Sequence, residues 1–567
     1  MNEMRRLVRL FAAQKGWMIS GLAIACVTVM ANFWLMTLSG WFLASTGIVG
    51  LSSFAVQNQF NFFTPAASVR FFATLRVGAR YGERLVTHEA TFRLLAELRA
   101  WFFGRLVPLA PAGLKDQRTG DLLARLSGDI DTLNLFYLRV YVPALAAGIT
   151  VGLMTLFFAW FSGWAALWLL VGLGLNGVAV PMLTARLGHK AGAEVTSTMA
   201  ALRTHYVEAA QSLPELLTYG AAPGALAEAA ALNGRLQAAQ GRMAGYAGLS
   251  LAASGLATNF TLLAVLVAGI KAVTGAGLNP ADLALLALGA VAAFEAVAPL
   301  PQAFAQYGQI KAAARRVFEV ADLPVPVAEP AVTAARPARF DLALEGVSLR
   351  YGADRPWALE DVTLRVAEGQ RIGVIGPTGA GKSTLINLLL RFYEYQAGSA
   401  RLGGQELRNF TPEQMARLVT VVSQRSHLFH TTIRDNLLLA RGDADEAALM
   451  NALEVAQLAD FVRGLPEGLD TVVGEAGIAL SGGQGRRIAL ARAVLRPTPW
   501  LILDEPTEGL DAGTEAAFLR DLAPVLAGRT VLVITHRPAP LALVDEVWRL
   551  EAGRLMAGPA VAALHKA

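Results

Sequence analysis

The chain has 567 residues, of which 54% are hydrophobic and 16% are charged, and its net charge is +5. A soluble domain carries about 25% charged residues, so this composition excludes a disordered chain and an ordinary water-soluble enzyme. The net charge is too small to indicate nucleic-acid binding without a localised basic patch. A single cysteine, Cys26, excludes an intrachain disulfide and a thiolate zinc site. The composition predicts a membrane protein over at least half of its length.

Long stretches without charge define this membrane half. No charged residue occurs between Lys15 and Arg70, over 54 consecutive positions. One bilayer crossing takes about 20 apolar residues, so this stretch holds two crossings. Further stretches cover 140–185, 243–270 and 281–307, the last interrupted by two acidic residues. The sequence therefore predicts six spans, near 17–44, 53–75, 140–161, 163–185, 245–271 and 281–307.

Basic residues orient these spans. Four of them precede the first span, whereas Lys and Arg are absent from the opposite turns, at 45–52, 162–163 and 272–280. Lys and Arg accumulate in cytoplasmic loops, so the N-terminus is predicted to be cytoplasmic. Residues 3–15 are predicted to form an interfacial amphipathic helix. The cytoplasmic segments 76–139 and 186–242 show helical periodicity and are predicted to be helices that leave the membrane and return.

The composition changes after the last span. Residues 322–338 contain four prolines among alanines, which is typical of an extended linker. From residue 339 onward short β-branched strands alternate with helices, as at Arg371–Ile375 and Val531–Ile534. This alternation predicts a parallel-sheet α/β domain over 339–567. The fold class is thus a multi-domain membrane protein, with a six-helix all-α transmembrane domain at 1–321, the linker, and this α/β domain.

A phosphate-binding loop follows the strand Arg371–Ile375. The segment Gly376–Thr384 reads GPTGAGKST and precedes a helix predicted at Leu385–Phe392. It fits the P-loop pattern in the strand-to-helix context that the pattern requires. Its glycines let backbone N–H groups turn toward phosphate oxygens at the positive end of the helix. Lys382 would reach the β- and γ-phosphates, and Ser383 would offer a hydroxyl to Mg²⁺.

Two carboxylates end a later apolar strand, Trp500–Leu503. Asp504 is placed to hold the Mg²⁺ shell, and Glu505, which follows it, could polarise an attacking water as a general base. A carboxylate pair alone is weak evidence, but together with a P-loop it predicts an ATPase. Mg²⁺ is expected to be held through Ser383, Gln424 and Asp504.

The segment Leu480–Gln484 reads LSGGQ and resembles the signature motif of ATP-binding cassette (ABC) transporters. Other motifs follow in the order of that family. Tyr351 resembles the adenine-stacking aromatic, Gln424 the γ-phosphate-sensing glutamine, Asp511 the loop that meets the opposite subunit, and His536 the switch histidine. The resemblance covers the whole chain and implies the half-transporter of an exporter, with a type I/IV exporter fold.

The resemblance also assigns roles at an ATP site. The residues implied to act in hydrolysis are Glu505, His536 and Gln424. The residues implied to bind ATP are Tyr351, Gly376, Thr378, Gly379, Gly381, Lys382, Ser383, Thr384 and Asp504. In this family two cassettes close head to tail, so the signature residues complete the ATP site of a partner; these are Ser481, Gly482, Gly483 and Gln484. A dimer is therefore required.

A cationic stripe marks the second span. Arg76, Arg80, Arg84 and His88 recur every four residues and share one helix face, with Arg70 further up the helix. Basic residues at membrane depth rarely face lipid. The expected substrate cavity, with Arg70, Arg76 and Arg80, would favour a small anionic or zwitterionic cargo. The alternative is a cytoplasmic extension whose arginines only follow the positive-inside rule.

Strings in the membrane half resemble the CydC-type subunits of bacterial heterodimeric cysteine and glutathione exporters. These strings are Leu38–Leu43, Arg80–Arg93, Pro108–Gly113 and Asp129–Arg139. The resemblance implies ATP-driven export of reduced thiols across the bacterial inner membrane with a CydD-type partner, in support of cytochrome bd assembly. It also implies haem b, held by His88 with Arg84 and Tyr307. Two alternatives remain: a homodimeric exporter of lipids or drugs, and a haem-sensing regulator of respiratory assembly.

Overall fold

A computed structural model describes residues 3–115, 117, 119–330, 333–352, 354–424, 427–474 and 480–558. The chain forms two compact units. The first comprises residues 1–108 and 117–323, and the second comprises 109–116 and 324–567. The short segment 109–116 therefore belongs to the second unit, although it lies inside the range expected for the membrane half. Residues 331 and 332 of the expected linker lie outside the described residues.

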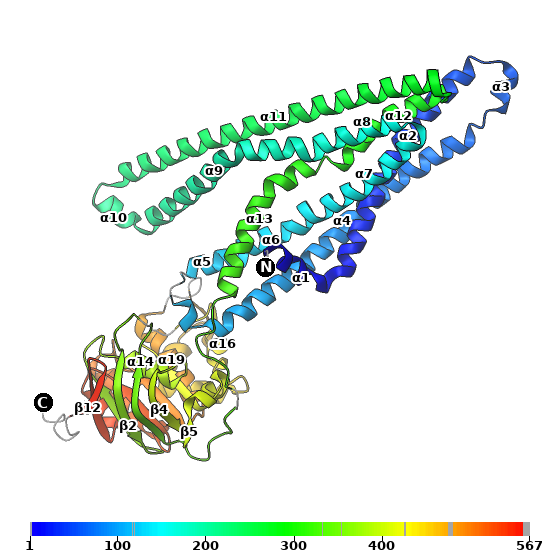
Figure 1. Cartoon of the computed structure of the whole chain (residues 1–567). Helices are drawn as coiled ribbons and strands as arrows, with labels where there is room; N and C mark the ends of the chain where they lie inside the picture. The colour runs from blue at the N-terminus through cyan, green and yellow to red at the C-terminus, as the bar shows by residue number, and fades with distance from the viewer. Residues whose placement is uncertain are drawn as a thin grey trace. The chain divides into compact units, whose positions relative to one another are not determined.

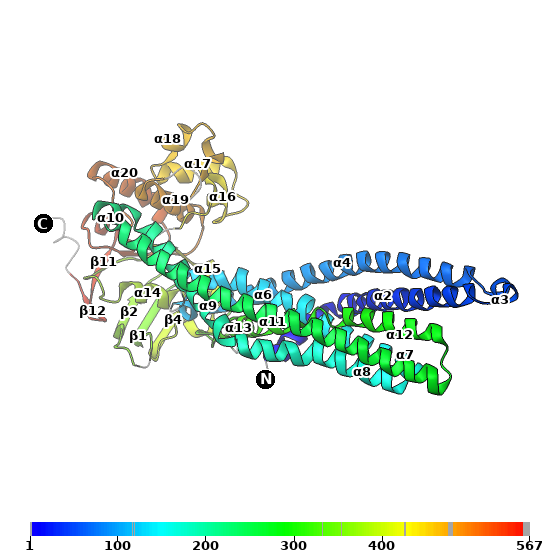
Figure 2. The same cartoon turned by 90° about the horizontal axis from the view of Figure 1, so that it is seen from above.

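The membrane unit consists of helices. Its first half contains α1 (Glu3–Phe11), α2 (Lys15–Gly50), α3 (Phe54–Gln59), α4 (Phe63–Leu106), α5 (Thr119–Ala124), α6 (Ile130–Leu135) and α7 (Val142–Phe161). Its second half contains α8 (Gly163–Gly174), α9 (Val180–Gln211), α10 (Leu213–Thr218), α11 (Ala222–Ala276), α12 (Pro280–Ala293) and α13 (Leu300–Ala321). Figures 1 and 2 show α9 and α11 side by side, joined at one end by α10. The long cytoplasmic extensions expected at 76–139 and 186–242 are mostly helical, and the first is interrupted by 3₁₀ turns at Val107–Leu109 and Ala112–Leu114.

Five continuous helical segments among the described residues are long and apolar enough to cross a membrane. They are Glu3–Gly50, Gly120–Phe161, Gly163–Gln211, Ala222–Gly275 and Pro280–Ala321. The remaining predicted span lies in α4, which has 44 residues but carries charges along its length. Ser162 caps α8 by accepting a hydrogen bond from the Ala165 N–H at 3.4 Å, which confirms the predicted tight turn between the third and fourth spans.

The second span, predicted near 53–75, starts about ten residues after its predicted beginning. Residues 54–59 form the separate short helix α3, and α4 begins only at Phe63. The Asn61 side chain accepts the Thr64 N–H at 3.1 Å, just before α4. Gln57 turns back and donates to the Gly50 and Ser52 carbonyls at the end of α2, which extends six residues beyond the predicted span. Side-chain bonds to the backbone therefore accompany both boundaries.

Small residues let the spans pack closely. A Cβ atom added to Gly40 of α2 would lie 2.6 Å from the Ala284 carbonyl oxygen of α12. Gly289 of α12 similarly faces Thr37 of α2 at 2.9 Å. Contacts of this kind replace the hydrophobic effect as the source of helix association in a bilayer. The sixth span is interrupted by a 3₁₀ turn at Phe294–Ala296, and the helix resumes at Leu300.

Two main sheets organise the second unit. The six-stranded sheet has the order β12-β11-β3-β10-β9-β6, and the four-stranded antiparallel sheet has the order β2-β1-β4-β5. The strands are β1 (Leu342–Leu349), β2 (Leu359–Val366), β3 (Arg371–Ile375), β4 (Ala397–Leu402), β5 (Gln405–Glu406), β6 (Val419–Val422), β9 (Trp500–Asp504), β10 (Thr530–Ile534), β11 (Glu546–Glu551) and β12 (Arg554–Ala557). A short pair, β7 (Thr431–Thr432) and β8 (Val472–Val473), lies apart.

The centre of the large sheet is parallel, as predicted. β10 pairs in parallel with both β3 and β9, and β9 pairs in parallel with β6. All five residues of β10 are buried, as expected of a parallel strand covered on both faces. The helices of this unit are α14 (Lys382–Leu389), α15 (Pro412–Leu418), α16 (Ile433–Leu438), α17 (Glu446–Val455), α18 (Ala459–Arg463), α19 (Gly482–Leu495) and α20 (Ala512–Leu522).

Candidate functional site

The ends of four parallel strands bring the predicted ATP-site residues together. The phosphate loop follows β3, Gln424 follows β6, Asp504 ends β9 and His536 follows β10. The carboxyl ends of parallel strands meet at one edge of a sheet, which is where α/β folds bind their ligands. Sequence positions separated by more than 150 residues therefore converge on one place.

The phosphate loop requires glycine at several positions. Gly379 and Gly381 have φ values of +83° and +109°, which L side chains rarely adopt. A Cβ atom on Gly381 would also lie 2.4 Å from the Ala358 carbonyl oxygen. The Lys382 ammonium donates to the Gly376 carbonyl at 2.7 Å and to the Pro377 carbonyl at 3.1 Å. This lysine therefore lies across the loop that would hold the phosphates.

The helix after the loop begins at Lys382, three residues earlier than predicted. Thr384 is buried, and its hydroxyl lies 2.9 Å from the Tyr351 hydroxyl. Asn387 also donates to this phenol, at 3.3 Å. The predicted adenine-stacking ring is thus tied by its hydroxyl to the phosphate-loop helix. The Lys115 ammonium lies over the same ring, 4.2 Å from its centroid.

The Asp504 carboxyl is partly buried and lies beside other acidic side chains. Burial raises the pKa of its carboxyl, and the neighbouring Glu505 charge raises this pKa further. Lys382 and the Gln424 backbone N–H act in the opposite direction, because both stabilise the ionised form. The carboxylate therefore has a cation and an N–H donor on the side where the phosphates would bind.

Glu505 and His536 form a hydrogen-bonded pair. Glu505 has a left-handed backbone conformation, with φ +52°, and is only 6% exposed. His536 Nδ1 lies 2.8 Å from Glu505 Oε1. A carboxylate only accepts hydrogen bonds at neutral pH, so Nδ1 is the donor and Nε2 is left facing away. The pair holds the carboxylate in one orientation at the strand edge.

Arg486 links two parts of the site that the sequence analysis did not connect. It donates to the Glu508 carboxylate at 3.1 Å, to the Glu508 carbonyl, and to the Gln424 carbonyl at 3.2 Å. The Gln424 side chain in turn donates to Glu508 at 3.3 Å. Arg486 lies two residues after the signature on α19, a spacing that could have marked it as a candidate. The signature helix is thereby tied to the loop that carries Gln424.

The signature residues form a helix start. Ser481 and Gln484 make a capping box, in which the serine hydroxyl accepts the Gln484 N–H at 3.2 Å and the glutamine side chain accepts the Ser481 N–H at 2.9 Å. This arrangement leaves the positive end of a 14-residue helix at the motif. Among the described residues no hydrogen bond or ion pair joins Ser481 or Gln484 to the phosphate loop.

Asp511 has a local structural role in the chain. Its carboxylate caps α20, accepting the Thr514 N–H at 3.0 Å and the Thr514 hydroxyl at 2.6 Å. These bonds lower the pKa of the Asp511 carboxyl, because they stabilise its ionised form. The predicted contact with an opposite subunit involves a chain that is not in this structure.

A charge cluster lies inside the membrane unit. Arg80 of α4 forms an ion pair with Glu295 at 2.6 Å, and the other Glu295 oxygen accepts a hydrogen bond from Asn32 of α2. Glu295 occupies the 3₁₀ interruption of the sixth span, and Asn32 is only 6% exposed. Arg80 and Glu295 keep 47% and 30% of their side-chain surface exposed.

The other predicted arginines behave differently. Arg70 is exposed and Arg76 is half-buried, and neither forms an ion pair or a side-chain hydrogen bond with the described residues. The stripe is therefore not uniformly cationic, because Glu295 neutralises Arg80. A helical wheel of α4 alone shows neither this partner nor Asn32.

The predicted haem residues are only partly assembled. His88 is exposed on α4, and its Nδ1 lies 2.8 Å from the Arg84 carbonyl. A carbonyl only accepts, so Nδ1 carries the hydrogen and Nε2 is available as a ligand atom. Tyr307 of α13 is 41% exposed, and among the described residues no hydrogen bond or ion pair joins it to His88 or Arg84. Counted from Phe63, His88 lies about 38 Å along the helix, which is longer than the hydrocarbon core.

Comparisons with known proteins agree with this architecture. Residues 17–294 match the ABC transporter transmembrane region, and residues 359–508 match the ABC transporter family. The chain is 36% identical to the glutathione/L-cysteine transport system ATP-binding/permease protein CydC of Escherichia coli (strain K12), over 98% of this chain and 96% of that protein. It is 33% identical to the protein of the same description from Haemophilus influenzae, again over 98% and 96%.

A solved structure shares the fold. The structure of a bacterial Atm1-family ABC exporter with ATP bound superposes with a TM-score of 0.83, at 22% identity, over 97% of this chain and 96% of that one. The strand-edge geometry, the matched family regions and the full-length relatives lead to one conclusion. The chain belongs to the ABC transporter family, as an exporter-type half-transporter whose ATP hydrolysis is coupled to transport.

Proposed function

We propose that this half-transporter exports reduced thiols, L-cysteine or glutathione, from the cytoplasm to the periplasm as the CydC-like half of a heterodimer. The observation that carries the proposal is its 36% identity, over 98% of its length, to a protein named for glutathione and L-cysteine transport. In this proposal the chain is a multi-pass protein of the bacterial inner membrane. Its N-terminus and ATP-binding unit lie in the cytoplasm, and its partner is a CydD-type chain.

The strand-edge residues supply the ATPase chemistry in this proposal. Lys382 exchanges its bonds to the Gly376 and Pro377 carbonyls for the β- and γ-phosphate oxygens. Glu505 accepts a proton from the attacking water, and His536 keeps its carboxylate oriented through the 2.8 Å bond. Tyr351 offers its ring to adenine while Thr384 and Asn387 hold its hydroxyl.

The oxygen donors of Ser383, Gln424 and Asp504 fit Mg²⁺, which prefers oxygen ligands and keeps substrate phosphates and waters in its shell. This assignment is supported by their positions at one edge of the sheet: Ser383 lies in the first turn of α14 after β3, Gln424 follows β6, and Asp504 ends β9. When bound, Mg²⁺ supplies positive charge to the phosphate oxygens. A single strand-end carboxylate with the phosphates is a normal set for this ion, so no larger acidic cluster is needed.

The site of one chain is half of a working site. Ser481 and Gln484 form a capped helix start. Among the described residues, neither side chain bonds to the phosphate loop of its own chain. A helix N-terminus stabilises anions through its free N–H groups and its dipole. We infer that this start completes the partner's ATP site, and that Asp511 lies in the loop that meets the partner.

The charge cluster in the membrane unit supports a zwitterionic cargo. Arg80 and Glu295 offer one positive and one negative group, each partly exposed, at the interruption of the sixth span. A cysteine or a glutathione carries an α-carboxylate and an α-ammonium group that match these two charges. A neutral lipid has no charged group that could bind Arg80 or Glu295. This cluster therefore argues against an exporter of lipids or drugs.

We also propose that this chain binds haem b through His88. The His88 imidazole fits an axial ligand, because its Nδ1 is held by a carbonyl and its Nε2 is free. Arg84 lies one turn before it and would be a propionate partner, whereas Tyr307 has less support, since among the described residues no hydrogen bond or ion pair joins it to either. Haem bound there would supply a redox-active iron. His88 also favours the alternative function, a haem-sensing regulator. Loss of the Soret absorption band in His88→Ala tests whether His88 is the haem ligand.

The decisive experiment measures ATP-dependent uptake of labelled cysteine and glutathione into inside-out vesicles that contain the heterodimer. Arg80→Gln and Glu295→Gln are each expected to lower uptake at least tenfold, because one substrate charge then lacks a partner. Glu89→Gln is the matched control, since it breaks the Arg93–Glu89 ion pair of 2.6 Å further along the same helix. Uptake that is absent in the unmodified heterodimer, or unchanged in both cluster variants, would contradict the proposal.

A further inference from the structure

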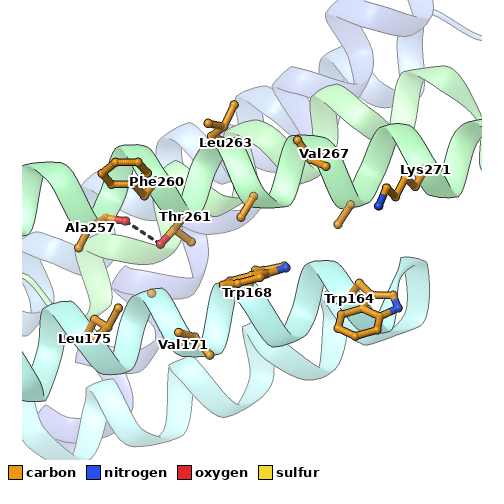
Figure 3. Close-up of a pocket in the computed structure, with 13 residues that line it drawn as sticks. Trp164, Trp168, Val171, Leu175, Ala257, Phe260, Thr261, Leu263, Val267 and Lys271 are labelled. Atoms are coloured by element: carbon orange, nitrogen blue, oxygen red, sulfur yellow. Dashed lines mark hydrogen bonds between the residues drawn. The ribbon is translucent and has the colours of Figure 1, made fainter.

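A large apolar cleft lies between α8 and α11, away from the charge cluster. Its volume is about 780 Å³. The residues that define it are Trp164, Trp168, Phe260, Ala264, Val267 and Lys271. Figure 3 shows Trp168 between the two helices, with Trp164 and Lys271 at the same end of the cleft. The lining residues are almost entirely apolar, and the charged one among them is Lys271.

The two helices touch within the cleft. A Cβ atom on Gly172 would lie 1.9 Å from the Thr261 hydroxyl oxygen, so α8 and α11 touch there. The Thr261 hydroxyl donates to the Ala257 carbonyl of its own helix at 2.7 Å (Figure 3). The floor of the cleft therefore presents no unpaired hydroxyl, and a hydrocarbon can contact it without a desolvation cost.

The cleft is long enough to cover one leaflet of a bilayer. On α11 its lining runs from Ala257 to Lys271, 14 residues apart, which is about 21 Å at 1.5 Å per residue. The hydrocarbon core is about 30 Å thick, so the cleft reaches from one surface past the bilayer centre. With the ATP-binding unit in the cytoplasm, as proposed above, Lys271 lies at the outer surface.

The mouth of the cleft is suited to a lipid headgroup. Lys271 is exposed and forms no ion pair or side-chain hydrogen bond with the described residues. Trp164 beside it is 69% exposed, and Trp and Lys side chains are typical anchors at the boundary of hydrocarbon and water. An unpaired ammonium above an apolar slot is complementary to a phosphate above an acyl chain.

We propose that this cleft binds one anionic phospholipid of the outer leaflet, with an acyl chain between α8 and α11 and its phosphate at Lys271. The lipid is a resident ligand and not the cargo. A zwitterionic thiol would leave its charges unpaired against these walls, so it does not fit the cleft. The proposal uses only the orientation given above and does not depend on which substrate is exported.

Native mass spectrometry of the purified heterodimer, titrated with phosphatidylglycerol, tests this site. Lys271→Gln is expected to weaken binding about fivefold, since one lysine near a surface contributes about that factor toward an anionic lipid. Ala268→Trp is expected to abolish the bound lipid by filling the cleft. The control is Lys190→Gln, which removes an exposed lysine from α9 and is expected to bind as the unmodified protein does.

A second measurement uses phosphatidylglycerol with brominated acyl chains, which quench nearby tryptophan fluorescence. Trp168→Phe is expected to remove a distinct quenched fraction, whereas Trp500→Phe, in the buried β9 of the other unit, is expected to leave it. Equal lipid retention in Lys271→Gln, Ala268→Trp and the control would overturn the proposal. A disulfide formed under an added oxidant between Ala264→Cys and a cysteine introduced into a partner helix would also overturn it, because a protein segment would then fill the cleft. Thiol uptake is measured separately, so its failure would leave this result standing.

Discussion

Replacement of Glu505 by glutamine separates ATP binding from ATP hydrolysis. Glutamine has nearly the same shape, and its side-chain oxygen still accepts the 2.8 Å hydrogen bond from His536 Nδ1. The left-handed backbone at this position, with φ +52°, is already tolerated by a similar side chain. The fold should therefore be unchanged. The substitution also removes a negative charge beside Asp504, which lowers the repulsion toward ATP phosphates.

The expected loss is in turnover. A positioned general base contributes about 10² to 10⁴ in rate, which corresponds to about 3 to 5 kcal/mol of activation free energy. Glu505 is 6% exposed, so bulk water does not readily replace it as a proton acceptor. Hydrolysis at this site should fall by at least a hundredfold, while the affinity for ATP stays equal or rises.

The assay uses the heterodimer with its partner's own ATP site disabled, so that only this site is measured. Phosphate release reports turnover, and binding of a fluorescent ATP analogue reports affinity. Glu467→Gln is a matched control, because Glu467 is exposed and forms no ion pair among the described residues. Turnover of Glu505→Gln at the rate of this control would refute the assignment of the base. Loss of binding would show that Glu505 is instead part of the phosphate cradle.

Two further predictions concern local geometry and pH. Gly381→Ala should lower ATP affinity at least tenfold in the same binding assay, because φ +109° and the 2.4 Å approach to the Ala358 oxygen both exclude a Cβ atom; unchanged affinity would contradict the loop geometry. Arg6 of α1 donates to Asp322 at 2.5 and 2.8 Å and holds the pKa of that carboxyl below its ordinary value of 3.8. An exposed ion pair of this kind contributes about 0.2 to 1 kcal/mol to the docking of α1. The contribution is present above pH 4 and is lost as pH falls through the lowered pKa of Asp322. The protection of the α1 amides, corrected for the intrinsic exchange rate at each pH, should therefore fall on acidification, and Asp322→Asn should show the lower protection already at pH 7; protection that does not change with pH would contradict the linkage.

The sequence by itself determined the ATP-binding unit in considerable detail. The strand at Arg371–Ile375 has the bounds that were predicted, the strand predicted at Val531–Ile534 begins one residue earlier, and the phosphate loop lies between β3 and α14. These features depend on consecutive residues: glycines that allow unusual backbone angles, and apolar runs buried on both faces of a sheet. Such requirements are local, so a short stretch of sequence is sufficient to reveal them.

The membrane unit depended more on the tertiary structure. The separate short helix α3 and the start of α4 at Phe63 moved the second span, and the pairing of Arg80 with Glu295 joins residues 215 positions apart. A helical wheel gives the face of Arg80 but not the helix opposite it. The cleft above Gly172 likewise exists only because α8 and α11 touch there and diverge. Charge pairs and clefts between distant helices depend on the rotation and crossing of those helices, and no local pattern in the chain encodes either one.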